Sequence, residues 1–171
     1  MKTLRLIFAA ACLVYVIGAG FSANARADDN SRIAVAVDCH CPDTVGAGFC
    51  AAFKDKVAAS PGYRLVSNTA SGYGIGVHLS SVDLWQGINA QLAGRITAVS
   101  VAFTIYAEKL PGEVYADSSV FRVGKDTFAE MSEKIVGALG QIVNLNASLF
   151  NQMRAESEKD SATGPTLKPS P

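Results

Sequence analysis

Residues 95–124 constrain the fold more than any other stretch of this sequence, because they have the pattern of two long strands joined by a tight turn. In Arg95–Glu108, apolar side chains alternate with small or polar ones, which is the period of a strand that buries one face. The apolar side carries Val99, Val101, Phe103, Ile105 and Ala107. Pro111 and Gly112 predict a chain reversal, after which Glu113–Val123 returns as a second strand.

The rest of the chain supplies the elements that such a half-buried sheet needs. Three shorter segments predict strands: Ile33–Val37, Tyr63–Val66 and Gly74–Val82. Apolar residues three and four apart predict helices over Val45–Ser60 and from Thr127 onward, and Thr127 with Glu130 matches a capping box. The element order is β-α-β-β-β-β-α. We therefore predict an α+β fold, a two-layer sandwich with a mainly antiparallel sheet and two helices on one face.

The start of the chain has the pattern of a secretory signal peptide. A basic beginning is followed by the apolar segment Leu6–Gly20 and by Ala25–Ala27, which offers small residues at a cleavage site. We therefore predict three parts: a signal peptide (1–27), a single α+β domain (28–154) and a disordered tail (155–171) rich in Ser, Lys, Pro and Gly. The expected location is the periplasm or the cell exterior.

Charge argues against a nucleic-acid binder. Cleavage after Ala27 would remove Lys2, Arg5 and Arg26, which changes the balance from 15 basic against 15 acidic residues to 12 against 15. A nucleic-acid-binding domain normally carries a basic face instead. No second apolar segment is long enough to span a membrane. The expected partner is therefore another protein or a second copy of the chain.

The cysteines of the mature chain are the most unusual cluster. Cys39, Cys41 and Cys50 remain after cleavage, and an oxidising compartment favours one disulfide among them. We predict that Cys50 bonds to Cys41 or Cys39 across the intervening loop, with Cys41–Cys50 as the assigned pair. The alternative is a copper or zinc site built from Cys39, His40, Cys41 and Cys50, since thiolate and imidazole ligands suit these ions. Against it, strand alternation points His40 away from both neighbouring cysteines.

No residue pattern predicts an enzyme, and no cofactor is expected. Redox enzymes of the thioredoxin type use C-x-x-C at a helix N-terminus, whereas this chain has C-x-C at the end of a strand. His78, Ser80 and Asp83 invite comparison with a hydrolase triad. However, His78 and Ser80 would project in parallel from one strand face rather than toward each other.

The second face of the sheet is the predicted interaction surface. If both helices cover one side, the other side is lined by Ala98, Ser100, Ala102, Thr104, Tyr106 and Tyr115. Small side chains flanked by aromatic ones make a flat, moderately apolar surface that can dock a partner. An unpaired strand edge and the C-terminal helix are further surfaces for contact.

The order of these elements resembles a group of small bacterial envelope domains. A signal peptide, a strand–helix–strand opening, a long hairpin over Ala98–Gly124 and a closing helix are similar to outer-membrane accessory proteins of the lipopolysaccharide-assembly, curli-secretion and Tol N-terminal types. The turn and return strand Gly112–Ser118 carry the likeness. The lipid-attachment cysteine common in those families is absent, since Cys12 lies inside the apolar run. The resemblance implies an exported, non-enzymatic protein that binds other proteins or itself; the alternative is the periplasmic metal-binding protein described above.

Overall fold

The structure is a computed structural model that describes residues 31–69 and 72–162. Its strands are β1 (Ile33–His40), β2 (Tyr63–Val66), β3 (Tyr73–Asp83), β4 (Ile96–Ala107) and β5 (Val114–Gly124). Its helices are α1 (Thr44–Ala59), the short 3-10 turn η2 (Lys125–Thr127), α2 (Phe128–Leu145) and α3 (Ala147–Ala162). The predicted signal peptide lies outside the described residues.

One five-stranded sheet has the order β2-β1-β3-β4-β5. Strand β1 runs parallel to both β2 and β3, and β3, β4 and β5 follow one another as an antiparallel meander. Helix α1 connects β1 to β2 as a crossover. The predicted α+β architecture is confirmed, and most of the paired residues are antiparallel.

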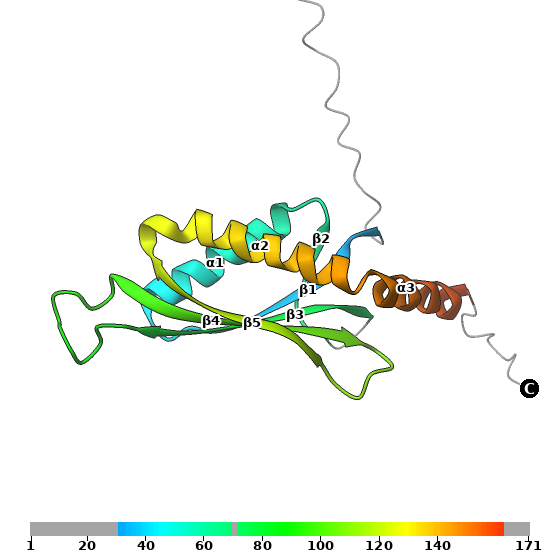
Figure 1. The fold of residues 1–171 in the computed structure, drawn as a ribbon, viewed down its shortest axis with the longest axis horizontal. Helices are drawn as coiled ribbons and strands as arrows, with labels where there is room; N and C mark the ends of the chain where they lie inside the picture. The colour runs from blue at the N-terminus through cyan, green and yellow to red at the C-terminus, as the bar shows by residue number, and fades with distance from the viewer. Residues whose placement is uncertain (1–30, 70–71, 163–171) are drawn as a thin grey trace, which may run out of the picture.

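Helices α1 and α2 cover the same face of the sheet (Figure 1). The core between them is formed by every second residue of the strands and by one stripe of each helix. Its fully buried side chains include Val35, Ile75, Val77, Val99, Val101, Phe103, Phe49, Phe53, Ile135 and Leu139. Each side chain of this size contributes roughly 1.5–3 kcal/mol when it leaves water, so this layer stabilises the fold. None of the helices in the described part of the chain is long and apolar enough to cross a bilayer.

The C-terminal helical segment differs from the prediction in its N-terminal cap and in its length. Thr127 does precede α2, but its hydroxyl bonds the backbone of Gly124, with Gly124 N donating to Thr127 Oγ1 at 3.0 Å, so the predicted capping box does not form. The chain then breaks at Asn146, whose side-chain amide donates to the Ile142 carbonyl oxygen at 2.9 Å.

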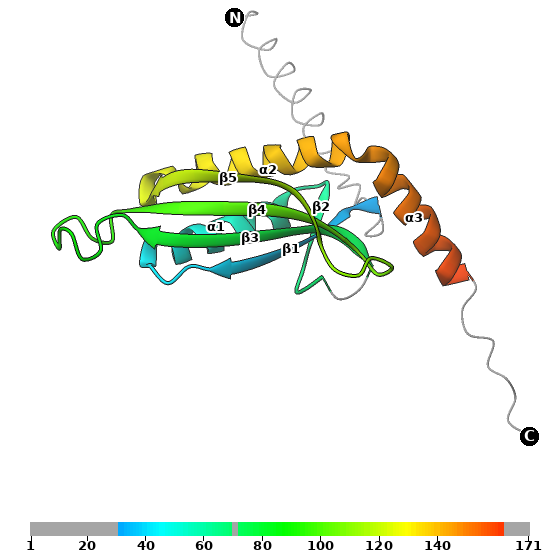
Figure 2. The same cartoon turned by 60° about the horizontal axis from the view of Figure 1, so that its bottom comes forward.

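Helix α3 continues beyond this break to Ala162, so the disordered tail predicted from residue 155 is wrong over 155–162. Residues 147–162 contain neither Gly nor Pro and are rich in Ala, Glu, Lys, Gln and Met, which favour helix. Figure 2 shows α3 turning away from α2 at one end of the molecule. Residues 163–171 lie outside the described part.

Asp43 fastens the start of α1 to the sheet. Its Oδ1 accepts a hydrogen bond from Gly46 N at 2.7 Å and so caps the helix. Its Oδ2 accepts bonds from Ser81 Oγ on β3 and from Thr97 Oγ1 on β4, the latter at 3.1 Å. Partial burial raises the pKa of Asp43, but the bonds from Ser81, Gly46 and Thr97 outweigh it and hold the pKa below its usual range.

We expect Asp43→Ala to lower the free energy of unfolding at neutral pH by about 2 kcal/mol, the upper range for a lost helix cap. Because the folded-state pKa is depressed, this stabilisation is complete above the unfolded pKa of about 4 and is lost as pH falls through the lower folded value. The difference in the free energy of unfolding between the wild-type protein and the variant should therefore decrease at acidic pH. Urea unfolding at neutral and acidic pH measures this difference.

Asp55→Ala is the matched control, since Asp55 is an exposed carboxylate of the same helix. It should change stability by less than about 0.5 kcal/mol at either pH. An equal loss in both variants would show that the Asp43 contacts do not anchor the helix.

Candidate functional site

The open face of the sheet, on the side away from α1 and α2, holds the residues predicted for it on β4. Ser100 is exposed, and Ala98, Ala102 and Thr104 are half-buried. Tyr115 on β5 lies opposite Thr104 and is 64% exposed. Five of the six predicted interaction residues are therefore at least partly accessible on one side of the sheet.

Tyr106 is the exception, because its side chain is buried with only 2% exposure. It packs with Ala34 and Ala36 of β1 in a small second cluster, and Val66 lies against it. A Cβ atom at Gly74 would lie 2.7 Å from Tyr106 Oη and 2.2 Å from the Ala34 carbonyl oxygen, so only glycine fits beneath the ring. The prediction that Tyr106 offers a docking surface is wrong, since small residues on two neighbouring strands leave a hollow that the ring fills.

A polar cluster occupies the open face beside this ring. His78 Nε2 lies 2.7 Å from Glu113 Oε2, and His78 Nδ1 lies 3.7 Å from Asp38 Oδ2. Thr104 Oγ1 also donates to Glu113 Oε2, and Thr69 Oγ1 donates to Glu113 Oε1 at 3.0 Å. The cluster thus links β1, β3, β4 and the residue that precedes β5.

Electrostatics favour a charged Glu113 in this cluster. Its side chain is 27% exposed, and this partial burial raises its pKa. Hydrogen bonds from Thr104, His78 and Thr69, together with the charge of His78, outweigh burial and lower the pKa below its usual range. The carboxylate is therefore an acceptor held by three side chains, an arrangement that fixes the start of β5 to the sheet.

Strand β5 forms one edge of the sheet. In the described part of the chain it pairs with β4 alone, so the hydrogen-bonding groups on its outer side face away from the sheet. Its 11 residues make it far longer than β2, the four-residue strand at the other edge. Val120 is 73% exposed and Val114 is 52% exposed. This edge combines free backbone groups with accessible apolar side chains, which is the usual basis of strand addition.

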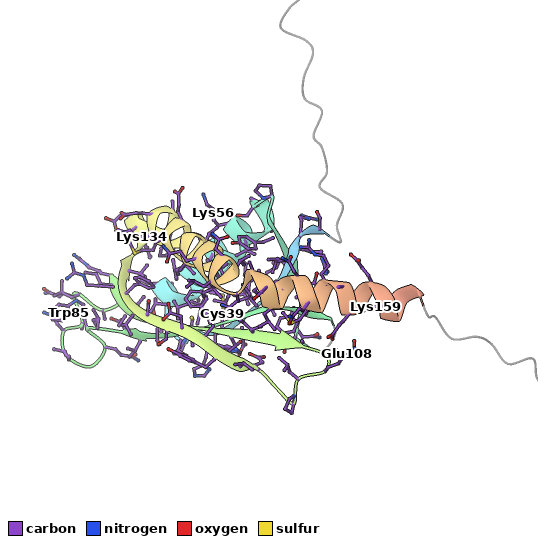
Figure 3. The ribbon with its side chains drawn as sticks, turned by 45° about the vertical axis from the view of Figure 1, so that its right-hand side comes forward. Cys39, Lys56, Trp85, Glu108, Lys134 and Lys159 are labelled. Carbon is purple, nitrogen blue, oxygen red and sulfur yellow. A yellow bond between two sulfur atoms is a disulfide. The ribbon has the colours of Figure 1, made fainter. Side chains whose placement is uncertain are left out.

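The cysteine cluster forms a disulfide between Cys39 and Cys50. Cys39 belongs to β1 and points to the same side as Val35 and Val37, toward α1, where Cys50 is buried (Figure 3). The two Cα atoms are 6.4 Å apart, within the usual range for such a bond. Cys41 follows the end of β1 and is a free, half-buried thiol 3.9 Å from the Leu79 carbonyl oxygen. The predicted Cys41–Cys50 pair is wrong, because β1 ends at His40: Cys39 is held within the strand over the helix, whereas Cys41 lies beyond the end of the strand.

The same bond removes two of the four ligands of the alternative metal site. Cys39 and Cys50 have no thiolate to offer an ion while they are bonded to each other. His40 is exposed on the opposite side of β1. Among the residues that the structure describes, no group of three or more His, Cys, Asp or Glu side chains could hold a metal ion.

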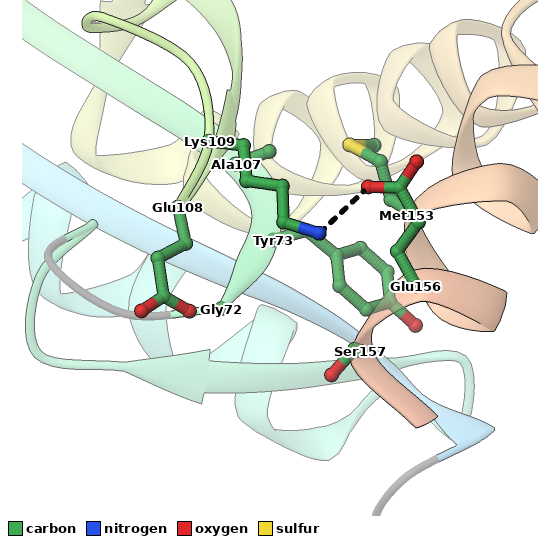
Figure 4. A pocket seen from close by; sticks show the side chains of 8 residues that line it. All are labelled: Gly72, Tyr73, Ala107, Glu108, Lys109, Met153, Glu156 and Ser157. Carbon is green, nitrogen blue, oxygen red and sulfur yellow. Dashed lines mark hydrogen bonds and ion pairs between the residues drawn. The ribbon is translucent and has the colours of Figure 1, made fainter. Parts of the chain in front are cut away.

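A cavity of about 300 Å³ lies between the start of β3, the β4–β5 turn and α3 (Figure 4). Tyr73 and Met153 form part of its wall, and Lys109 Nζ lies 3.4 Å from Glu156 Oε2 beside it. Arg154 Nε donates to Tyr73 Oη at 3.4 Å. These contacts tie α3 to the sheet at this end.

Comparisons with known proteins add little. No protein-family model matches the chain, and no curated protein matches it. A solved structure of the hypothetical protein CT253 from Chlamydia trachomatis has a TM-score of 0.35 and 10% identity, covering 66% of this chain and 94% of its own. A likeness at this level supports no inference about function.

Sequence patterns placed His78 and His40 correctly on the side away from the core, but they missed the role of Glu113. Glu113 is 35 residues from His78 in the chain, and the two meet only through the pairing of β3, β4 and β5. The absence of a Cβ at Gly76 leaves the space in which Glu113 Oε2 lies. No local pattern carries that information.

We expect Glu113→Gln to destabilise the protein by roughly 1–2 kcal/mol at neutral pH, because a charged acceptor of three hydrogen bonds is lost. His78→Gln should lower the free energy of unfolding by a smaller amount in the Glu113→Gln variant than in the wild-type protein. The double-mutant cycle from urea unfolding should give a coupling energy of about 1 kcal/mol. Strictly additive effects would show that the two side chains do not interact in solution.

Removing the disulfide by Cys39→Ala with Cys50→Ala should lower the free energy of unfolding by about 3 kcal/mol, the chain-entropy value for a loop of this length. Cys41→Ala keeps the disulfide and serves as the control, with a loss below about 1 kcal/mol. Peptide mapping of the oxidised protein checks the pairing directly. A fragment that joins Cys41 to Cys50 would contradict the structure.

Proposed function

We propose that this chain is an exported, non-enzymatic envelope protein that binds another protein, or a second copy of itself, along the free edge of β5. The observation that carries the proposal is the long outer edge of β5 with its exposed Val114, Tyr115 and Val120. A partner segment in extended conformation would add a strand there. The adjoining open face would accept alternate side chains of that segment.

The regular part of this edge is long enough for such pairing. A bulge interrupts the β4–β5 register at Phe103/Thr104, and Asp117–Gly124 pairs without interruption beyond it. At about 3.3 Å per residue, this segment presents an edge of roughly 26 Å. Val120 lies opposite Ser100 within it, so an apolar side chain faces the same side as the open face.

Two further observations support export. The first 27 residues have the pattern of a signal peptide. The Cys39–Cys50 disulfide suits an oxidising compartment such as the periplasm or the exterior, since cytosolic thiols are normally kept reduced.

Site-specific photo-crosslinking tests the proposal. A photoreactive amino acid placed at position 120 in the producing cell should yield a defined adduct on illumination. The same amino acid at Ala58, an exposed position of α1, is the matched control and should yield at least about tenfold less. An adduct of twice the protein's mass would identify the partner as a second copy.

A second pair of variants separates the β5 edge from the helical surface. With the photoreactive group at Ser118, Val120→Asp should reduce the adduct, because a charge replaces an exposed apolar contact. Leu145→Asp makes the same kind of change at the α2–α3 junction, where Leu145 is 84% exposed, and should leave the adduct intact. Equal adducts from positions 120 and 58, or loss only in Leu145→Asp, would reject β5 as the binding edge.

A further inference from the structure

The outward-pointing backbone groups of β5 belong to every second residue, and the register of the sheet shows which ones. Leu84 N donates to the Ile96 carbonyl oxygen, and the two residues lie opposite each other in the β3–β4 register, so the even-numbered residues of β4 bond to β3. The odd-numbered residues of β4 then bond to β5. They pair with odd-numbered residues of β5, as Val101 does with Ser119. The N–H and C=O groups that point outward therefore belong to Ser118, Val120 and Arg122.

This part of β5 lacks the features that usually keep a free edge from pairing. Such features are proline, lysine, bulges and charged side chains on the covered side of the strand. The bulge and Asp117, which pairs with the buried Phe103, both come before residue 118. Residues 118–124 contain neither proline nor lysine, and Val120 is 73% exposed. The edge is therefore open to another strand.

Polar groups on the open face of β5 include a donor and acceptors that are not bonded to each other. Arg122 is the only cation of the strand, and its side chain has no hydrogen-bond or ion-pair partner among the residues that the structure describes. Ser118 Oγ lies 2.9 Å from Tyr115 Oη. Hydroxyl oxygens have lone pairs that a guanidinium group can use. The strand thus carries a cationic donor four residues away from a pair of neutral acceptors.

These features complement one another when two copies of β5 pair in antiparallel orientation about a two-fold axis at Val120. Val120 then lies opposite Val120 of the second copy, and Ser118 lies opposite Arg122. The outward-pointing groups of these three residues face each other, which gives about six main-chain hydrogen bonds. The two Arg122 side chains lie four residues apart, about 13 Å along the strands. Asp117 lies opposite Val123, so no like charges meet.

Symmetry favours a second copy as the partner of this edge. A two-fold interface covers the long edge of both copies at once. Each five-stranded sheet then keeps only the four-residue strand β2 as a free edge. Short edge strands resist further pairing, so assembly stops at two chains. An unlike partner strand would have to be supplied separately to every molecule.

We propose that this chain forms a symmetric homodimer in which β5 pairs with β5 of a second copy about a two-fold axis at Val120. The inference rests on the proposed binding along β5 and names the partner. Because the axis is perpendicular to the sheet, the helical layers of both copies lie on one side. The two open faces form one continuous surface on the other side.

Sedimentation equilibrium of the purified protein, with its disulfide intact, tests the dimer. The wild-type protein should sediment with twice the mass of one chain. Val120→Asp should raise the dimer dissociation constant by about tenfold or more, because the axis places two like charges directly opposite each other. Ile88→Asp is the matched control, since Ile88 is 76% exposed but lies in the loop between β3 and β4, and it should leave the mass unchanged. Circular dichroism checks that both variants are folded.

A variant of opposite charge tests the position of the axis. Val120→Lys should weaken self-association as Val120→Asp does, for the same reason. An equimolar mixture of the two variants should associate at least about tenfold more tightly than either variant alone, because opposite charges then face each other. A wild-type protein that stays monomeric up to about 0.1 mM, or a mixture that associates no more tightly than its components, would overturn the proposal.

This failure is distinguishable from failure of the proposed function. A monomeric protein that still gives an adduct with a different protein from position 120 would reject the homodimer and retain β5 as a binding edge. The absence of any adduct from position 120 would reject both.

Discussion

Burial of one face of β4 is the constraint on which the rest of the structure depends. Water is almost completely excluded from Val99, Val101 and Phe103. This burial requires helices that cover that face of the sheet. Helices α1 and α2 provide that cover, and Asp43 holds the first of them in place through Ser81 and Thr97. An apolar row and one capping carboxylate thus determine which side of the sheet remains open.

Glycine residues of β3 determine which side chains can pack on the open face of the sheet. Gly74 allows the ring of Tyr106 to lie against β1, and Gly76 leaves room for the carboxylate of Glu113. At these two positions, side chains from β4 and from the β4–β5 turn pack directly against the backbone of β3. The apolar side chains that remain exposed on this side of the sheet include Tyr115 and Val120 on β5.

The architecture could be predicted from the sequence because the core obeys simple periods. Alternation in β4 and the three-and-four spacing in α2 follow directly from which face is buried. The candidate site could not be predicted to the same degree. Whether Cys39 or Cys41 meets Cys50 depends on where β1 ends, and whether Tyr106 is exposed depends on Ala34 and Gly74 on other strands. Such outcomes are set by cross-strand register, which local periodicity does not contain.

The break at Asn146 divides the C-terminal helical segment into α2 and α3, and α3 has fewer buried contacts with the rest of the protein than α2 has. Helix α2 is anchored along its length by Ile135, Leu139 and Ile142, whereas α3 is anchored by Phe150 and Met153 near its beginning and by polar contacts beyond them. Fewer buried apolar contacts mean a smaller free energy of local opening. Helix α3 can therefore separate from the sheet as a cooperative unit of its own, exposing Tyr73 and the adjoining cavity while the disulfide-bonded β1–α1 region and the rest of the core remain folded.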